Sequence, residues 1–273
     1  MEGIYRFADL TVKIEYQHEY FKYMAADYEV ASRAVCKADN ESNPDIAQES
    51  GIDETISITE FDIRSEAKRN EETDRAHDGV IETLAIYRKL CERLIHRNVL
   101  LIHASAIAKD GKAYLFVAPS GTGKSTHTRL WRETFGDKVF MINDDKPLLR
   151  FDGESFLAYG TPWNGKHHLD TNVSVPIGGI CFLGRGVENK IWKVSAGDGL
   201  VQLLASVYRP DAADGMKKTL ELVAELTKRV PLWQMECNIS PEAAIMACEA
   251  MTQEERLGRK WHETEGRRDH KRN

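Results

Sequence analysis

A glycine-rich segment between an apolar run and a helical pattern constrains this chain more than any other feature. Residues 113–117 are apolar (Ala-Tyr-Leu-Phe-Val), and residues 118–125 read Ala-Pro-Ser-Gly-Thr-Gly-Lys-Ser. A strand followed by a glycine turn, Gly-Lys-Ser and a helix is typical of a phosphate-binding loop, in which backbone N–H groups and the helix N-terminus surround phosphates. The segment therefore predicts an α/β fold with this loop at the edge of a central sheet.

Each residue type in the loop suits nucleotide binding. We predict that Lys124 reaches the β and γ phosphates of ATP, and that the Ser125 hydroxyl ligates the Mg²⁺ that bridges them. Ala118 replaces the first glycine of the usual G-x-x-x-x-G-K-[ST] pattern, which is tolerable where that residue is still strand-like. The alternative is an ordinary Gly/Ser turn. The predicted nucleotide contacts are Ser120, Gly121, Thr122, Gly123, Lys124, Ser125 and Thr126.

A second apolar strand ends in acid. Residues 139–142 precede Asn143, Asp144 and Asp145, an arrangement that looks like a Walker B element. Because ligands bind at the carboxyl ends of strands in an open α/β sheet, we expect these acids to meet the phosphate loop. Neighbouring side chains on an extended backbone point apart, so we assign Asp144 to Mg²⁺ and Asp145 to the proton of an acceptor hydroxyl. The alternative is a pair of turn-forming or N-capping aspartates.

Three further residues are candidates for the same site. His103 lies in the apolar run 99–108, where a hydrogen-bonded core histidine is the default interpretation. Lys166 stands in a polar loop and could clamp a transferred phosphate, or be an ordinary solvated lysine. Arg185, next to a glycine, gives a weaker signal for an anion contact.

The remaining pattern predicts strands and helices on both sides of the loop. Strands are expected at 4–16, 55–59, 99–108, 113–117, 139–142, 148–151, 155–159, 179–183 and 230–237, and helices at 20–28, 80–95, 124–135, 196–207, 212–229 and 241–251. We expect a smaller α+β region over 1–97 and a nucleotide-binding catalytic domain over 98–252. An acidic segment over 39–78, flexible near 65–77, and a disordered tail over 253–273 complete the prediction.

Charge and cysteine usage narrow the class of function. The 37 basic and 43 acidic residues give a net charge of −6, which argues against a general nucleic-acid binder. Five scattered cysteines without C-x-x-C spacing predict a reducing compartment and no zinc site. The first residues lack signal-peptide character, and no apolar run approaches the ~20 residues that span a bilayer. We therefore expect a cytoplasmic protein with no membrane partner.

Three features together resemble the catalytic domain of HPr serine kinase/phosphorylase, a family similar to phosphoenolpyruvate carboxykinase around the nucleotide. They are His103 in His-Ala-Ser-Ala-Ile before a short hairpin, the Ser-Gly-Thr-Gly-Lys-Ser loop, and the strand that ends in two aspartates. The likeness covers about residues 100–251 and is closer to HPr-kinase-related proteins found beside peptide-modification genes. It implies active-site roles for His103 and Lys124 and a proton-accepting role for Asp145. The family's metal-binding Glu-x-Arg-Gly signature has no counterpart, and residues 161–166 fall in that region.

The sequence thus predicts a Mg²⁺-dependent kinase that transfers the γ-phosphoryl group of ATP to a hydroxyl of a protein, a peptide or a small molecule. The predicted catalytic residues are His103, Lys124, Asp144, Asp145 and Lys166, and the predicted metal ligands are Ser125 and Asp144. The alternative hypothesis is a nucleotide-binding regulatory or interaction module without phosphotransferase activity. The identity of the acceptor, the choice between ATP and GTP, and a homo-oligomeric state stay open at this point.

Overall fold

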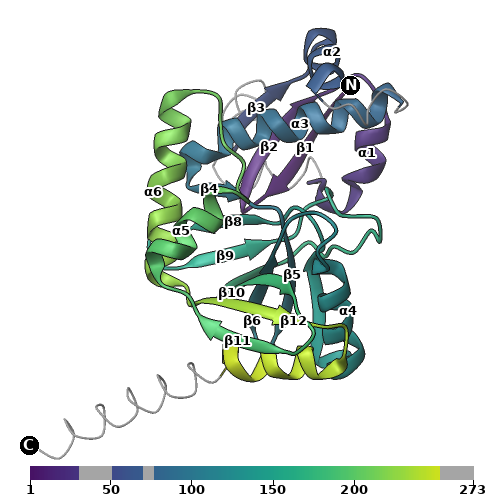
Figure 1. The fold of residues 1–273 in the computed structure, drawn as a ribbon. Helices are drawn as coiled ribbons and strands as arrows, with labels where there is room; N and C mark the ends of the chain where they lie inside the picture. Colours follow the sequence, from purple (N-terminus) through teal and green to yellow (C-terminus); the bar gives the residue numbers. More distant parts are fainter. Residues whose placement is uncertain (31–50, 70–76, 253–273) are drawn as a thin grey trace, which may run out of the picture.

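Two β-sheets organise the described part of the chain, which comprises residues 1–30, 51–69 and 77–252 (Figure 1). The structure is a computed structural model in which one sheet has nine strands and the other has three. The tail expected to be disordered, 253–273, lies outside the described residues, as do parts of the acidic segment expected over 39–78. None of the described helices combines the length and the apolar character needed to cross a bilayer.

The three-stranded sheet consists of β1 (Glu2–Phe7), β2 (Leu10–Glu15) and β3 (Glu54–Ser57), with β2 in the middle. Strands β1 and β2 run antiparallel across a two-residue turn, and both turn residues, Ala8 and Asp9, have positive φ as a type I′ hairpin requires. Strand β3 adds parallel to β2. Buried residues alternate along β2, as the sequence predicts, so one face of this sheet is covered.

Four helical segments pack around the small sheet: α1 (Tyr20–Met24), η1 (Ala26–Tyr28), α2 (Glu60–Arg69) and α3 (Asp78–Leu94). The sequence does not predict α2, whose last turns occupy residues 65–69 of the stretch expected to be flexible. An ion pair accounts for the difference. Glu66 is only 4% exposed and accepts hydrogen bonds from Arg88 of α3 at 2.6 and 2.9 Å, which fixes α2 to α3.

The strands of the large sheet are β4 (Val99–Leu101), β5 (Ala104–Lys109), β6 (Lys112–Val117), β7 (Val139–Asn143), β8 (Leu148–Phe151), β9 (Phe156–Tyr159), β10 (Ser174–Arg185), β11 (Lys190–Lys193) and β12 (Leu232–Cys237). They lie in the order β4-β8-β9-β10-β6-β5-β7, with β12 between β10 and β11. The run 99–108, predicted as one strand, is two strands that pair with different partners and are separated at Ile102 and His103. Strand β11 is not predicted.

Helices cover both faces of the large sheet: α4 (Lys124–Phe135), α5 (Ala196–Leu204), α6 (Ala213–Arg229) and residues 241–252, with the short turns η4 (Ile95–Arg97) and η5 (Gly136–Lys138) at element ends (Figure 1). Alternate residues of β6 serve the two faces. Leu115 belongs to the core shared with α5 and α6, whereas Phe116 belongs to the core shared with α4 and residues 241–252. The predicted mixed α/β architecture is confirmed.

Candidate active site

One edge of the large sheet brings most of the predicted site residues together. Strand β5 lies between β6 and β7 and is antiparallel to both, pairing Ala104 with Val117 and Ala106 with Asn143. The end of β6, the end of β7 and the start of β5 therefore share one edge. The glycine loop after β6, the two aspartates after β7 and His103 before β5 meet there.

The loop after β6 needs glycine at two points. Gly121 has a φ of 74° and Gly123 a φ of 125°, conformations in which a side chain is strained, and α4 begins at the next residue, Lys124. Ala118 is not among the positive-φ residues of the described chain, so its methyl group is accommodated. Strand, turn and helix follow in the predicted order, and an anion in this loop would meet the N-terminus of α4.

Lys124 is buried beside the loop. It is 7% exposed, and its Nζ donates a hydrogen bond to the carbonyl oxygen of Ala118 at 2.9 Å. Burial lowers the pKa of Lys124, and the negative charge of Asp145 acts in the opposite direction. Because a buried cation is stabilised by a nearby anion, a phosphate bound in the loop would offset the cost of this burial.

Asp145 lies between His103 and Lys146. Its Oδ1 is 3.1 Å from His103 Nε2, and its Oδ2 is 3.6 Å from Lys146 Nζ. Burial raises the pKa of Asp145, but the hydrogen bond from His103 and the charges of Lys146 and Lys124 outweigh burial and leave this pKa below its ordinary value. Asp145 is therefore an ionised, partly exposed hydrogen-bond acceptor at the sheet edge.

Asp144 has the opposite environment. It is 3% exposed, its Oδ1 accepts a hydrogen bond from the Gly165 backbone, and its buried Oδ2 has no hydrogen-bond partner among the described residues. Burial raises the pKa of Asp144, and the negative charge of Asp145 raises it further. A buried carboxylate oxygen without a partner is destabilising unless a cation or a proton compensates it, so Asp144 suits a metal ligand.

Asn143 fixes the turn that carries both acids. Its Oδ1 accepts hydrogen bonds from the backbone N–H groups of Asp145, at 2.8 Å, and Lys146, at 2.6 Å. Its Nδ2 donates to the backbone oxygen of Thr161 at 2.9 Å, which ties the turn to the following loop. In the sequence, Asn143 is recognisable only as the end of an apolar strand. An amide between an apolar strand and two acids is the signal that could have indicated this positioning role.

Within the described part of the chain, Lys166 has no hydrogen bond or ion pair with another predicted site residue. Its side chain is exposed in the loop after Asn164 and Gly165. The charge of the neighbouring His167 lowers the pKa of Asp144. His167 also lines an open hollow of about 500 Å³ together with Ser125, Thr126, Arg129, Arg132 and Leu169.

Two basic residues acquire contacts that the sequence does not indicate. Lys146, which is not predicted, pairs with Asp145 and places its ammonium 5.2 Å from the centre of the Tyr87 ring in α3. Arg185, predicted as a weak anion contact, donates from Nη2 to the backbone oxygen of Gly121 at 2.6 Å. Lys146 therefore links the acids to the N-terminal part of the chain, and Arg185 holds the glycine loop.

The described residues contain no group of three or more His, Cys, Asp or Glu side chains that could hold a metal by themselves. Magnesium commonly binds through one or two carboxylates, water and the phosphates of its substrate. Asp144 has a carboxylate oxygen and Ser125 a hydroxyl oxygen, which are ligand types that such a site uses.

Comparison with solved structures finds similarity to the Hpr(Ser) kinase/phosphatase from Coxiella burnetii, with a TM-score of 0.36 and 10% identity over 61% of this chain and 96% of that chain. A similarity of this size carries no argument about fold or function. Comparison with curated proteins finds no match. The sequence profile described as "SynChlorMet cassette protein ScmC" matches residues 71–243. Because this match spans more than half of the 273 residues, the chain belongs to the ScmC family.

Proposed function

We propose that this protein is a Mg²⁺-dependent phosphotransferase that transfers the γ-phosphoryl group of ATP to a hydroxyl group. The observation that carries the proposal is the pairing of Asp145 with His103 at 3.1 Å, at the same sheet edge as the glycine loop and Lys124. Phosphoryl transfer needs a phosphate cradle, charge compensation and a group that orients the acceptor, and this edge supplies a candidate for each.

The phosphates are placed in the loop of residues 118–123, with the ammonium of Lys124 on the β and γ phosphates. Ser125 and Asp144 are the ligands proposed for Mg²⁺. A Mg²⁺ ion held there would neutralise negative charge on the phosphates. The partnerless, buried Oδ2 of Asp144 supports this assignment, since burying a carboxylate oxygen needs compensation.

Asp145 acts on the acceptor. As the hydroxyl oxygen attacks the γ phosphorus, a new oxygen–phosphorus bond forms, the bond to the β–γ bridging oxygen breaks, and the hydroxyl proton passes to Asp145. The low pKa of Asp145 keeps it ionised to receive a hydrogen bond from the incoming hydroxyl. His103 holds the carboxylate in its orientation at 3.1 Å.

Substitution of Asp145 tests the proposal. Asp145→Asn keeps the shape of the side chain but removes its negative charge, so we expect transfer of label from γ-labelled ATP to acceptors in a cell extract to fall by about two or more orders of magnitude. ATP affinity measured by calorimetry should change little. Asp137→Asn, at an exposed position in η5, is the matched control and should transfer as the parent protein does.

Two outcomes would contradict the proposal. Undiminished transfer by Asp145→Asn would remove Asp145 from the mechanism. Tight binding of ATP without any label transferred by the parent protein would instead favour a nucleotide-binding regulatory module.

A further inference from the structure

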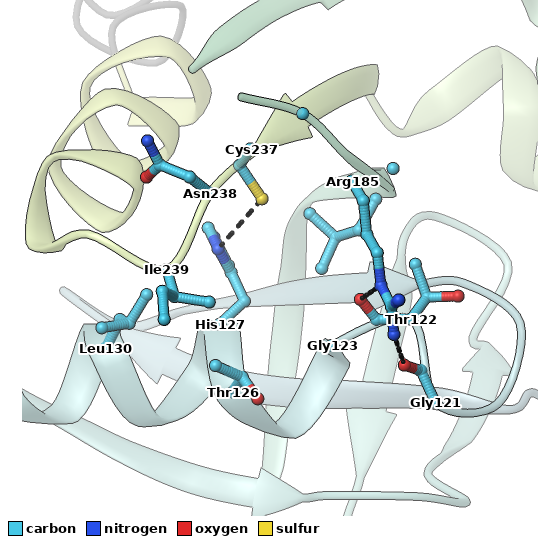
Figure 2. A pocket seen from close by; sticks show the side chains of 13 residues that line it. Gly121, Thr122, Gly123, Thr126, His127, Leu130, Arg185, Cys237, Asn238 and Ile239 are labelled. Carbon is cyan, nitrogen blue, oxygen red and sulfur yellow. Dashed lines mark hydrogen bonds between the residues drawn. The ribbon is translucent and has the colours of Figure 1, made fainter. Parts of the chain in front are cut away.

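A second hollow, of about 390 Å³, lies on the other flank of the glycine loop (Figure 2). Its floor is the face of α4 that carries Thr126, His127 and Leu130, and its walls are the ends of β10 and β12 with the residues after them. The volume is within the roughly 300–1,000 Å³ of small-molecule sites. Neither acid of the candidate active site lines this hollow, so it needs a separate explanation.

The strand order puts the hollow and the two acids on opposite sides of β6. Strand β7, which ends just before both acids, lies two positions from β6 on one side, while β10 and then β12 lie on the other side. A nucleotide whose terminal phosphate faces Asp145 therefore directs its other end away from β7. That end leaves the loop on the flank of β10 and β12, where the hollow lies.

His127 presents a hydrogen-bond donor to this hollow. The side chain is 2% exposed, and Trp131 Nε1 donates to its Nε2 at 3.1 Å, so the proton of the neutral ring is on Nδ1. Burial lowers the pKa of His127 to about 4, which keeps the ring neutral near pH 7. The partner of Nδ1 is the thiol of Cys237 at 4.0 Å, and sulfur is a weak acceptor (Figure 2).

Two residues that line the hollow differ in what they can offer a ligand. The amide of Asn238 is engaged at both ends, because its Nδ2 donates to the Val187 backbone at 3.0 Å and its Oδ1 accepts from the Ser240 backbone at 3.0 Å. Ile239, in contrast, is 78% exposed beside the hollow and can cover the flat face of a ligand.

We infer that this hollow binds the purine base of the nucleotide, with a ring nitrogen accepting the Nδ1–H of His127 and the ring plane against Ile239. The inference rests on the proposed function for the direction of the phosphate chain. An unprotonated ring nitrogen is a better acceptor than the Cys237 thiol, and a two-ring base contributes more apolar surface than a pyrimidine.

Calorimetry with ATP, GTP, UTP and inorganic triphosphate tests the inference. Triphosphate reports on the loop alone, so the parent protein should bind ATP or GTP roughly tenfold or more tightly than triphosphate, and UTP more weakly than the better purine. Ile239→Asp should lower the affinity for that purine nucleotide to the level of triphosphate and leave triphosphate affinity unchanged. Ile245→Asp, on the helix of residues 241–252 and outside the hollow, is the matched control and should bind as the parent does.

The rate at which Cys237 is alkylated, measured on the peptide that contains this residue, is a second test and needs no substitution. The purine nucleotide should protect this thiol and triphosphate should not, because the thiol lines the hollow. Equal affinities for all four ligands, with Cys237 equally reactive in each complex, would overturn the base site but leave the loop assignment standing. If triphosphate does not bind, or if Lys124→Ala does not abolish its binding, the proposed function would be overturned instead.

Discussion

Asp144 and Asp145 are neighbours in the chain, yet their carboxyl groups have opposite electrostatic environments. Burial raises the pKa of Asp144, whereas contacts with His103 and nearby lysines bring the pKa of Asp145 below its ordinary value. On acidification Asp144 therefore takes up a proton first. A proton on Asp144 competes directly with a metal ion, while Asp145 is still ionised in the same pH range.

Asp144→Asn tests the metal role. Removing the charge should raise the Mg²⁺ concentration needed for half-maximal transfer by about tenfold or more, while Asn can still accept the hydrogen bond from Gly165. In the parent protein this Mg²⁺ requirement should increase as the pH falls toward the raised pKa of Asp144, and in the variant it should lose that pH dependence. Magnesium titrations of transfer at several pH values measure both effects, and equal requirements in the two proteins would exclude Asp144 as a ligand.

The same substitution, which should impair Mg²⁺-dependent transfer, should increase the stability of the fold. Because the folded-state pKa of Asp144 is raised, the folded state binds more protons than the unfolded state, and this group's contribution to stability declines as the pH rises through its pKa values. The uncharged variant avoids that loss. We therefore expect Asp144→Asn to have the higher free energy of unfolding at pH 7 in denaturant titrations, and a lower value would contradict the assigned environment.

For single residues, the sequence predicts the environment of some side chains and misses the contacts of others. The sequence predicts that the two aspartates point apart on an extended backbone. One is buried and the other partly exposed, but both lie in the bend after β7, where Asn143 rather than strand alternation sets the backbone. The pairing of His103 with Asp145 depends on the ladder between β5 and β7, which no local pattern encodes. Lys146 is missed for the same reason, since its contact with Tyr87 bridges distant parts of the chain. The catalytic roles themselves stay predictions.

The loop after β9 approaches Asp144 so closely that a side chain at Gly165 would crowd its carboxylate. A Cβ at Gly165 would stand 3.0–3.1 Å from the carboxylate atoms of Asp144, closer than side chains normally pack. The same residue donates its backbone N–H to Asp144. Loop and strand end thus form one unit in which backbone geometry sets the orientation of a predicted metal ligand.

Gly165→Ala should displace the Asp144 carboxylate by a few tenths of an ångström and weaken its hydrogen bond. We expect transfer to fall about tenfold, the Mg²⁺ requirement to rise, and the free energy of unfolding to decrease by about 1 kcal/mol. Gly197→Ala is the matched control, because the nearest atom to a Cβ there is Ser195 Oγ at an ordinary 3.9 Å. Activity assays and denaturant titrations compare the two, and equal activity of both variants would show that the close approach is unimportant.

Helices and strands with strong hydrophobic periodicity, or with glycines at their ends, are predicted well. The helix expected at 124–135 has those bounds, since the glycines before it and Gly136 after it mark its ends. Strand β11 is missed because it is a short edge strand with lysine at both ends and no apolar alternation. Helix α2 is missed because its stabilising pair lies 22 residues apart in the sequence, between Glu66 and Arg88.

Trp163 is one of several residues that join the N-terminal sheet to the large sheet. Its ring lies 5.6 Å from the Phe7 ring of β1 and 5.1 Å from the Tyr87 ring of α3, and its Nε1 donates to the Thr83 backbone at 2.9 Å. Tyr28 adds a second link by donating to Asp170 at 2.8 Å. The sequence shows a polar loop here and gives no sign of these partners, which lie far away in the chain.

Trp163→Ala should therefore disturb both parts of the molecule. Losing a buried tryptophan is expected to lower the free energy of unfolding by about 3–5 kcal/mol, while Trp163→Phe, which mainly loses the bond to Thr83, should lower it by about 1–2 kcal/mol. Hydrogen exchange should show protection lost together in α3 and in residues 160–170 of Trp163→Ala, and label transfer should fall because the same loop supports Asp144. Loss confined to residues 160–170, with α3 protected as in the parent, would mean that the N-terminal sheet is stable without this contact and does not hold the loop of residues 160–170.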